Sequence, residues 1–157
     1  MKTLRRRRKE NKTDYKARLS MLKSEKPRLI IRKTNRYIIA QIVESHIAQD
    51  KVLFGASTQD LLEKGWPKEN TGSLKSRPAA YLLGLLIAKK AKGKIKEAIL
   101  DLGLQRNVPG SRLYAVVKGA IDGGLSIPHS AESLPSSDLI NSNEKLQKAF
   151  NSVKEKI

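Results

Sequence analysis

Residues 28–43, which read RLIIRKTNRYIIAQIV, decide the fold. Two runs rich in β-branched residues flank Thr34 and Asn35. That pattern predicts two antiparallel strands joined by a tight hairpin, because Asn tolerates a positive φ in a short turn. Residues 51–57, KVLFGAS, add a third strand after a short loop. Together these segments predict a three-stranded antiparallel meander.

The remainder of the core is predicted to alternate helix and strand. A Leu-rich helix begins near Pro78, which suits a first helical turn, and Gly93 closes it. Residues 97–103, EAILDLG, form a continuous apolar run of the kind found in buried parallel strands. Ser111 caps another helix, whose apolar residues recur at the helical period. The predicted class is α/β (α+β mixed): the meander plus a parallel strand, with helices packed on the sheet, in the order βββ-α-β-α.

Charge is the strongest signal in the composition. The chain has 157 residues, with 32 Lys and Arg against 15 Asp and Glu, a net charge of +17. Residues 1–36 alone hold 15 basic and 3 acidic side chains. Such a charge repels itself unless a polyanion neutralises it, so we expect a polyanionic partner. No membrane-spanning segment is expected, because the most apolar stretch, residues 79–88, is far shorter than the roughly 20 residues that a spanning helix needs.

Three regions are expected from these patterns. Residues 1–27 form a basic RNA-binding arm, too poor in apolar side chains to fold alone and therefore disordered until it is bound. Residues 28–130 form the mixed α/β core domain. Residues 131–157 form a polar C-terminal extension that is partly helical.

The arm has two local features. A short helix is expected over about residues 13–23, with Thr13 or Asp14 as its cap. The basic run at residues 5–9 is also typical of a solvated tail or a nuclear-import signal. Binding is favoured over these two interpretations, because the positive charge continues well beyond such a short motif.

Catalytic and metal-binding chemistry finds little support. The absence of cysteine excludes a disulfide framework, a thiolate metal site and a cysteine nucleophile. His46 and His129 lack the spacing of metal ligands. A two-metal nuclease needs several converging carboxylates, for which Glu44, Asp101 and Asp122 are candidates. The first strand and the long helix carry no acid, so we expect no enzymatic activity, no metal and no cofactor.

Cations and polar groups cluster around the predicted hairpin turn. Guanidinium groups fork onto phosphate or stack on bases, and tyrosine offers a platform for an unpaired base. Aromatic residues make up only 4% of the chain, so we expect contact with a folded RNA rather than broad stacking along single strands. Positive charge also protects an edge hairpin from aggregation. Beside the basic arm, RNA binding is favoured for Arg32, Lys33, Asn35, Arg36, Tyr37 and Gln41.

An ordered series of short motifs resembles a known family. RRRRKENKTDYKARL (5–19) and KPRLIIRKTNRYIIAQ (26–41) are followed by GASTQDL, GWP, PAAYLLGLLIA, AILDLGL, PGSRLYAVVKGAIDGGL and IPHS. Each motif is weak alone, but the series runs in order from about residue 5 to residue 130. In this respect the chain resembles family eighteen of the archaeal and eukaryotic-type large-subunit ribosomal proteins, the 5S rRNA binders. Residues 139–157 match no motif of that family.

The resemblance implies a structural protein of the large ribosomal subunit, located in the cytoplasm. It implies binding to 5S rRNA, attachment of that RNA to the large-subunit (23S-type) rRNA in the central protuberance, and contact with neighbouring ribosomal proteins, including the second 5S-binding protein. It assigns RNA contacts to the six hairpin residues and, in the arm, to Arg5, Arg6, Arg7, Arg8, Lys9, Lys12, Tyr15 and Arg18. A metal-dependent nuclease acting on structured RNA and a non-specific nucleic-acid chaperone remain as alternatives.

Overall fold

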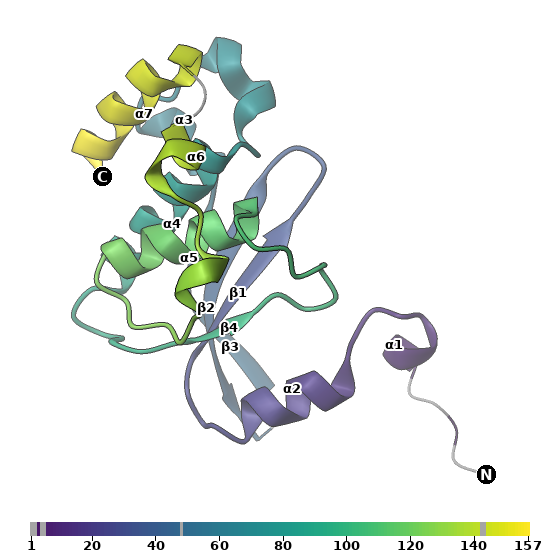
Figure 1. Cartoon of the computed structure of the whole chain (residues 1–157). Helices are drawn as coiled ribbons and strands as arrows, with labels where there is room; N and C mark the ends of the chain where they lie inside the picture. Colours follow the sequence, from purple (N-terminus) through teal and green to yellow (C-terminus); the bar gives the residue numbers. More distant parts are fainter. Residues whose placement is uncertain (1–2, 4–5, 48, 142–143) are drawn as a thin grey trace.

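A four-stranded mixed sheet forms the centre of the molecule (Figure 1). The computed structural model describes residues 3, 6–47, 49–141 and 144–157. The strand order is β3-β2-β1-β4; β1–β2 and β2–β3 are antiparallel, and β1 and β4 are parallel. The strands are β1 (Arg28–Lys33), β2 (Ile38–His46), β3 (Gln49–Ser57) and β4 (Ile99–Asp101). The predicted meander with one parallel strand is confirmed.

The β1–β2 turn is longer than we predicted and has a different conformation. The Thr34 hydroxyl donates to the Tyr37 carbonyl at 2.7 Å and accepts from the Tyr37 N–H at 3.0 Å. Asn35 does not have a positive φ. The connection is therefore the four residues 34–37, held by a threonine side chain. Arg36 and Tyr37, which we placed in the second strand, belong to the turn.

Two helices, α4 (Arg77–Ala91) and α5 (Arg112–Asp122), cover one face of the sheet. They cross at a pair of glycines. A Cβ at Gly84 would collide with the Val116 carbonyl, and a Cβ at Gly119 would collide with the Tyr81 carbonyl. Because neither glycine carries a side chain, the two helix backbones approach closely and both helices reach the sheet.

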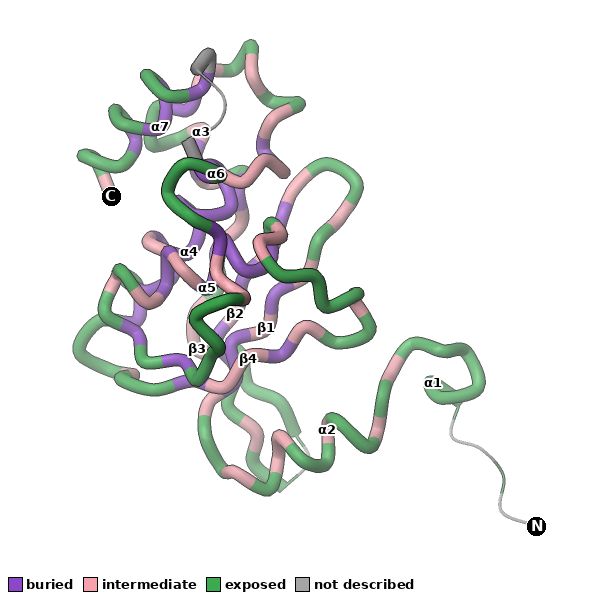
Figure 2. Tube along the Cα trace, viewed as in Figure 1, coloured by how far each residue is buried: buried purple, intermediate pink, exposed green. Residues whose placement is uncertain are grey.

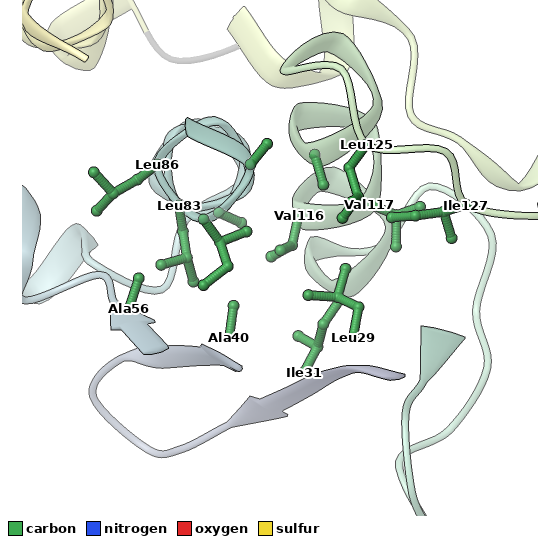
Figure 3. Packing of buried hydrophobic residues seen from close by; sticks show 14 of the residues in the cluster. Leu29, Ile31, Ala40, Ala56, Leu83, Leu86, Val116, Val117, Leu125 and Ile127 are labelled. Atoms are coloured by element: carbon green, nitrogen blue, oxygen red, sulfur yellow. The ribbon is translucent and has the colours of Figure 1, made fainter. Parts of the chain in front are cut away.

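The main core lies between this helix pair and the sheet (Figure 3). Leu29 and Ile31 of β1 and Ala40 of β2 point toward Leu83 of α4 and Val116 of α5. All five are fully buried. Burying a large aliphatic side chain contributes about 1.5 to 3 kcal/mol, so this contact fixes which face of the sheet is covered.

The parallel strand differs from the prediction. The apolar run at 97–103 was expected to be buried, but β4 is a short edge strand with Ile99 and Leu100 half-buried. Gly103, at φ +60°, lies just beyond the end of the strand. An edge position gives the strand only one neighbour, β1, so a continuous apolar run does not require a neighbour on each side.

The C-terminal extension packs on the body. Phe150 and Val153 of α7 join Leu82 of α4 and Trp66 in a second core cluster. The apolar side of α7 thus covers the side of α4 that turns away from the sheet. The remaining short elements are α3 (Asp60–Glu63), η1 (Lys68–Ser73), η2 (Ala131–Ser133) and α6 (Ser137–Asn141), and α7 spans Glu144–Lys156.

The arm forms two short helices, α1 (Arg6–Lys9) and α2 (Tyr15–Leu22). The Asp14 carboxylate accepts hydrogen bonds from the N–H groups of Lys16 and Ala17, which confirms the expected helix and its cap. Neither helix buries a residue, in keeping with an arm that is too poor in apolar side chains to fold alone. Within the described part of the chain, no helix is long and apolar enough to cross a membrane.

Candidate nucleic-acid interface

A buried ion pair joins the two parallel strands beneath the candidate surface. The guanidinium of Arg28, at the start of β1, donates to Asp101 Oδ2 on β4 at 2.9 Å, and the side chains are 2% and 6% exposed. Its other terminal nitrogen donates to Ser45 at 2.9 Å and to Asp50 at 2.8 Å. The charge of Arg28 is therefore neutralised within the protein, and this residue belongs to the scaffold.

Asp50 links this network to the arm. Its second carboxylate oxygen accepts from Arg18 of α2 at 2.8 Å. Burial by itself would raise the pKa of Asp50, but the hydrogen bonds from Ser45 and Arg28 and the charges of Arg28 and Arg18 together lower it below its usual value. Asp50 therefore stays ionised and ties the base of the arm to the sheet.

Arg32 has the same partner as Arg28. Its guanidinium donates to Asp101 Oδ1 at 3.0 Å and to the Asp101 carbonyl at 2.9 Å, and it remains 40% exposed. A Cβ at Gly103 would lie 2.9 Å from the Arg32 guanidinium carbon, so the absent side chain makes room for it. Arg32, which we predicted to contact RNA, is thus also part of the scaffold, because it pairs with Asp101.

The three carboxylates of the nuclease hypothesis do not form a common site: Asp101 and Asp122 are bonded to other side chains, and Glu44 is exposed on β2. Asp101 forms ion pairs with two arginines, and the Asp122 carboxylate accepts a hydrogen bond from the Tyr81 hydroxyl at 2.7 Å. Glu44 is exposed on β2, opposite Lys51 in the register. Among the described residues, no three His, Cys, Asp or Glu side chains gather in a way that could hold a metal ion.

The hairpin turn presents polar groups to solvent. Lys33, Asn35 and Arg36 are exposed and Tyr37 is half-buried. The Asn35 carbonyl accepts from Lys75, which adds a further cation beside the turn. Within the described residues, neither Lys33 nor Arg36 forms an ion pair or a side-chain hydrogen bond. Gln41 lies apart from them, half-buried on the sheet face opposite the helices.

The arm adds a second group of cations. Arg6, Arg7, Arg8, Lys9 and Lys12 are exposed, whereas Tyr15 and Arg18 are half-buried; Arg5 lies outside the described residues. Arg6 and Lys12 share Glu10 at 2.9 Å each. The hydrogen bonds from Lys12 and then Arg6 lower the pKa of Glu10. One acid thus serves two of these cations, and the arm keeps a large excess of positive charge.

A third candidate contact, formed by the loop of residues 102–111 between β4 and α5 and the first residue of α5, was not predicted. Figure 1 shows this loop, the β1–β2 turn and the arm on the same side of the molecule, and Figure 2 shows all three largely exposed. Arg106 in the loop and Arg112 just after it are exposed. The only sequence signal was two arginines around the Pro109-Gly110 turn with no acid between them.

The fold and the surface are those of a small protein built to bind a polyanion, with no constellation of catalytic carboxylates among the described residues. Helices α4 and α5 are packed against one face of the sheet, Asp101 and Asp122 are paired with other side chains, and the arm, the β1–β2 turn and the 102–111 loop lie on one side. Such a surface offers donors to phosphate oxygens, which position a protein on a nucleic acid.

Comparison with known proteins identifies the family. Residues 1–98 and 90–130 match the family of ribosomal large subunit proteins 60S L5 and 50S L18. A relative from Korarchaeum cryptofilum named large ribosomal subunit protein uL18 is 48% identical over 136 residues, 86% of this chain and 68% of the relative. Relatives of the same name from Methanoregula boonei and Caldivirga maquilingensis are 46% and 49% identical over 85% and 87% of this chain, and 75% and 65% of their own length. The chain belongs to this family of large-subunit ribosomal proteins.

Membership in the family confirms the resemblance seen in the motifs. The family consists of structural ribosomal proteins and not of enzymes, so the nuclease hypothesis is rejected. The chain is a component of the large ribosomal subunit that acts in translation, with ribosomal RNA and ribosomal proteins as its classes of partner.

Proposed function

We propose that the chain binds 5S rRNA and helps to attach it to the large-subunit rRNA in the central protuberance. The observation that carries this proposal is the one-sided placement of the basic arm, the β1–β2 turn with exposed Arg36 and the 102–111 loop with exposed Arg106 (Figures 1 and 2). The series of motifs that resembles the 5S-binding family supports the choice of RNA. Location in the cytoplasm and contact with the second 5S-binding protein follow from the same proposal.

A folded RNA fits this surface better than a single strand does. The candidate residues contain two aromatic side chains, Tyr15 and Tyr37, and both are half-buried. Stacking platforms for successive bases are therefore few, whereas donors for phosphate and 2′-hydroxyl oxygens are many. Recognition is then of the shape of the RNA, through three points of contact set by the sheet and its loops.

The candidate arginines and lysines are expected to contact RNA in two different ways. Arg8, Lys9 and Arg36 are exposed and bind phosphate as free cations. Arg18 and Arg32 contact RNA only through the nitrogen atoms that Asp50 and Asp101 leave unused. We therefore rank Arg8, Lys9 and Arg36 above Arg18 and Arg32 in their share of the affinity.

The test compares 5S rRNA with an unrelated folded RNA of equal length at moderate salt. Tighter binding of 5S rRNA is expected, because three contact points at fixed spacing select one shape. Equal affinity for the two RNAs contradicts the proposal. Equal affinity for duplex DNA as well would favour the non-specific nucleic-acid chaperone.

A further inference from the structure

A cationic cleft opens beside the β1–β2 turn. It has a volume of about 470 Å³ and is lined by Lys33 at the end of β1, by the first residues of α4 and α5, and by the 102–111 loop. Four cationic side chains line it, and none of its lining residues is acidic. These cations are Lys33, Arg77, Arg106 and Arg112.

The cations of the cleft are available to a ligand. Among the described residues, Lys33, Arg106 and Arg112 have no ion-pair partner. Arg77 uses only its Nε, which donates to the Gly110 carbonyl at 3.2 Å, and this bond leaves its terminal nitrogens free to turn to an anion. Arg77 and Arg112 are the first residues of their helices, where the backbone dipole also favours negative charge.

Two further polar atoms in the cleft lack partners. The Ser111 hydroxyl and the side-chain amide oxygen of Gln105 are buried, and neither forms a hydrogen bond with any residue that the structure describes. Ser111 stands at the N-cap of α5, as expected, but its side chain does not cap the helix. An unpaired buried polar group is costly, so both atoms are available to hydrogen-bond a ligand that enters the cleft. A hydroxyl can donate to phosphate, whereas the Gln105 oxygen requires a donor.

The size and lining of the cleft indicate a ligand larger than a simple anion. Its volume falls within the range of about 300 to 1,000 Å³ that is typical of sites for small organic ligands. Val108, Pro109 and Leu113 supply an apolar wall beside the cations. A nucleotide matches this combination, because it carries a phosphate, donor groups on its ribose and base, and a flat apolar face.

We propose that this cleft receives a single unpaired nucleotide of the bound RNA, with its phosphate among Lys33, Arg77, Arg106 and Arg112. This inference rests on the proposed function, since it assumes an RNA ligand. An RNA is favoured over an acidic protein segment for two reasons. The cleft includes Lys33 of the predicted RNA-binding turn, and its loop continues to Leu104, which lines a smaller cavity with arm residues Arg8 and Tyr15.

The test neutralises the two exposed arginines of the cleft. The double variant Arg106→Gln, Arg112→Gln should keep its fold, because both side chains are exposed and Arg106 and Arg112 have no ion-pair partners among the described residues. A matched control is Lys92→Gln, Lys96→Gln, two exposed cations in the segment between α4 and β4, which Figure 1 draws on the side opposite the arm. Circular dichroism of both variants checks the fold.

Binding to 5S rRNA is measured together with nucleotide-resolution chemical probing. The cleft variant should bind about tenfold more weakly than the control, with a log–log salt slope lower by about 1.4 to 1.8 for two lost phosphate contacts. One or two neighbouring unpaired nucleotides should lose protection while the rest of the footprint stays. Affinity and slope equal to those of the control overturn the inference. A footprint that weakens evenly, with no local loss, also overturns it.

The two proposals fail separately. Whether the wild-type chain discriminates 5S rRNA from the unrelated folded RNA decides the proposed function. Whether the cleft variant differs from the Lys92, Lys96 control on the RNA that is bound decides the nucleotide site. If the cleft variant still binds 5S rRNA specifically, with the affinity of the control, the proposed function stands and the nucleotide site is rejected.

Discussion

At the scale of the residue, one carboxylate organises the base of the sheet. Asp101 receives Arg28 and Arg32 from the neighbouring parallel strand, 73 and 69 residues away in the chain. In the sequence, Asp101 was only an acid within an apolar run. The pairing requires the parallel register of β1 and β4, which brings Ile30 opposite Asp101 and which no local pattern encodes.

Removing the charge of Asp101 should strongly destabilise the fold. In Asp101→Asn, the buried guanidinium of Arg28 keeps only Asp50 as a counter-charge, and breaking a buried pair in this way costs about 3 to 5 kcal/mol. Urea denaturation measures the free energy of unfolding. Glu97→Gln, which breaks the exposed Lys26–Glu97 pair, is the control and should leave that free energy nearly unchanged, because solvent screens an exposed pair. Equal effects of the two substitutions would contradict the structural role of Asp101.

Asp50 should make the stability depend on pH in acid. Its pKa is lower in the folded chain than its usual value of 3.8, so its contribution is present above that value and is lost as the pH falls through the folded pKa. The difference in unfolding free energy between the wild type and Asp50→Asn should therefore be largest at neutral pH and shrink toward pH 3. A difference that stays constant between the two pH values would show that ionised Asp50 does not stabilise the fold.

At the scale of the element, the helices and strands were predictable from the sequence, but the turn between β1 and β2 and the packing of the elements were not. The three strands, the two long helices and the Asp14-capped helix follow from local periodicity and capping residues. The hydrogen bonds of Thr34 that hold the turn and the edge position of β4 depend on which strands pair. The packing of α7 on α4 depends on tertiary contact in the same way.

The glycine crossing of α4 and α5 should tolerate no side chain. In Gly84→Ala the new Cβ meets the Val116 carbonyl and the Ala120 nitrogen, which are backbone atoms and cannot turn aside. The helices would have to separate and open the main core, at a cost above the 1 to 3 kcal/mol that is roughly typical of overpacking. The midpoint of thermal unfolding reports the change. Gly72→Ala is the control, since nothing lies within 4 Å of its Cβ and its φ is ordinary; an equal shift in both variants would refute the close crossing.

The β1–β2 hairpin should separate RNA binding from folding. Arg36→Ala removes an exposed cation and should weaken RNA binding without loss of unfolding free energy. Arg32→Ala should cost about 1 to 2 kcal/mol of stability, less than a fully buried pair because its guanidinium is 40% exposed. Parallel measurements of RNA affinity and urea denaturation decide this. The reverse ranking in stability would mean that Arg32 is a free RNA contact and Arg36 a structural residue.

At the scale of the whole molecule, the fold gathers cations that the sequence keeps far apart. The arm and the turn were predictable because charge is dense in residues 1–36. The cleft was not, because Lys33, Arg77 and Arg112 come together only when β1, α4 and α5 pack. Each is an ordinary surface cation in the sequence. The arm, the β1–β2 turn and the 102–111 loop thus lie on one side of the molecule, away from the C-terminal helix α7 (Figure 1).

The central claim is that this one-sided surface meets RNA phosphate, and the salt dependence of 5S rRNA binding tests it most directly. The variant with Arg6, Arg7, Arg8 and Lys9 changed to Gln is compared with a control in which the exposed residues Lys64, Lys92, Lys96 and Lys148 are changed to Gln. Each lost phosphate contact lowers the log–log slope by about 0.7 to 0.9, so the arm variant should lose about 3 and the control little. A slope that is equal in the arm variant, the control and the wild type would contradict the account.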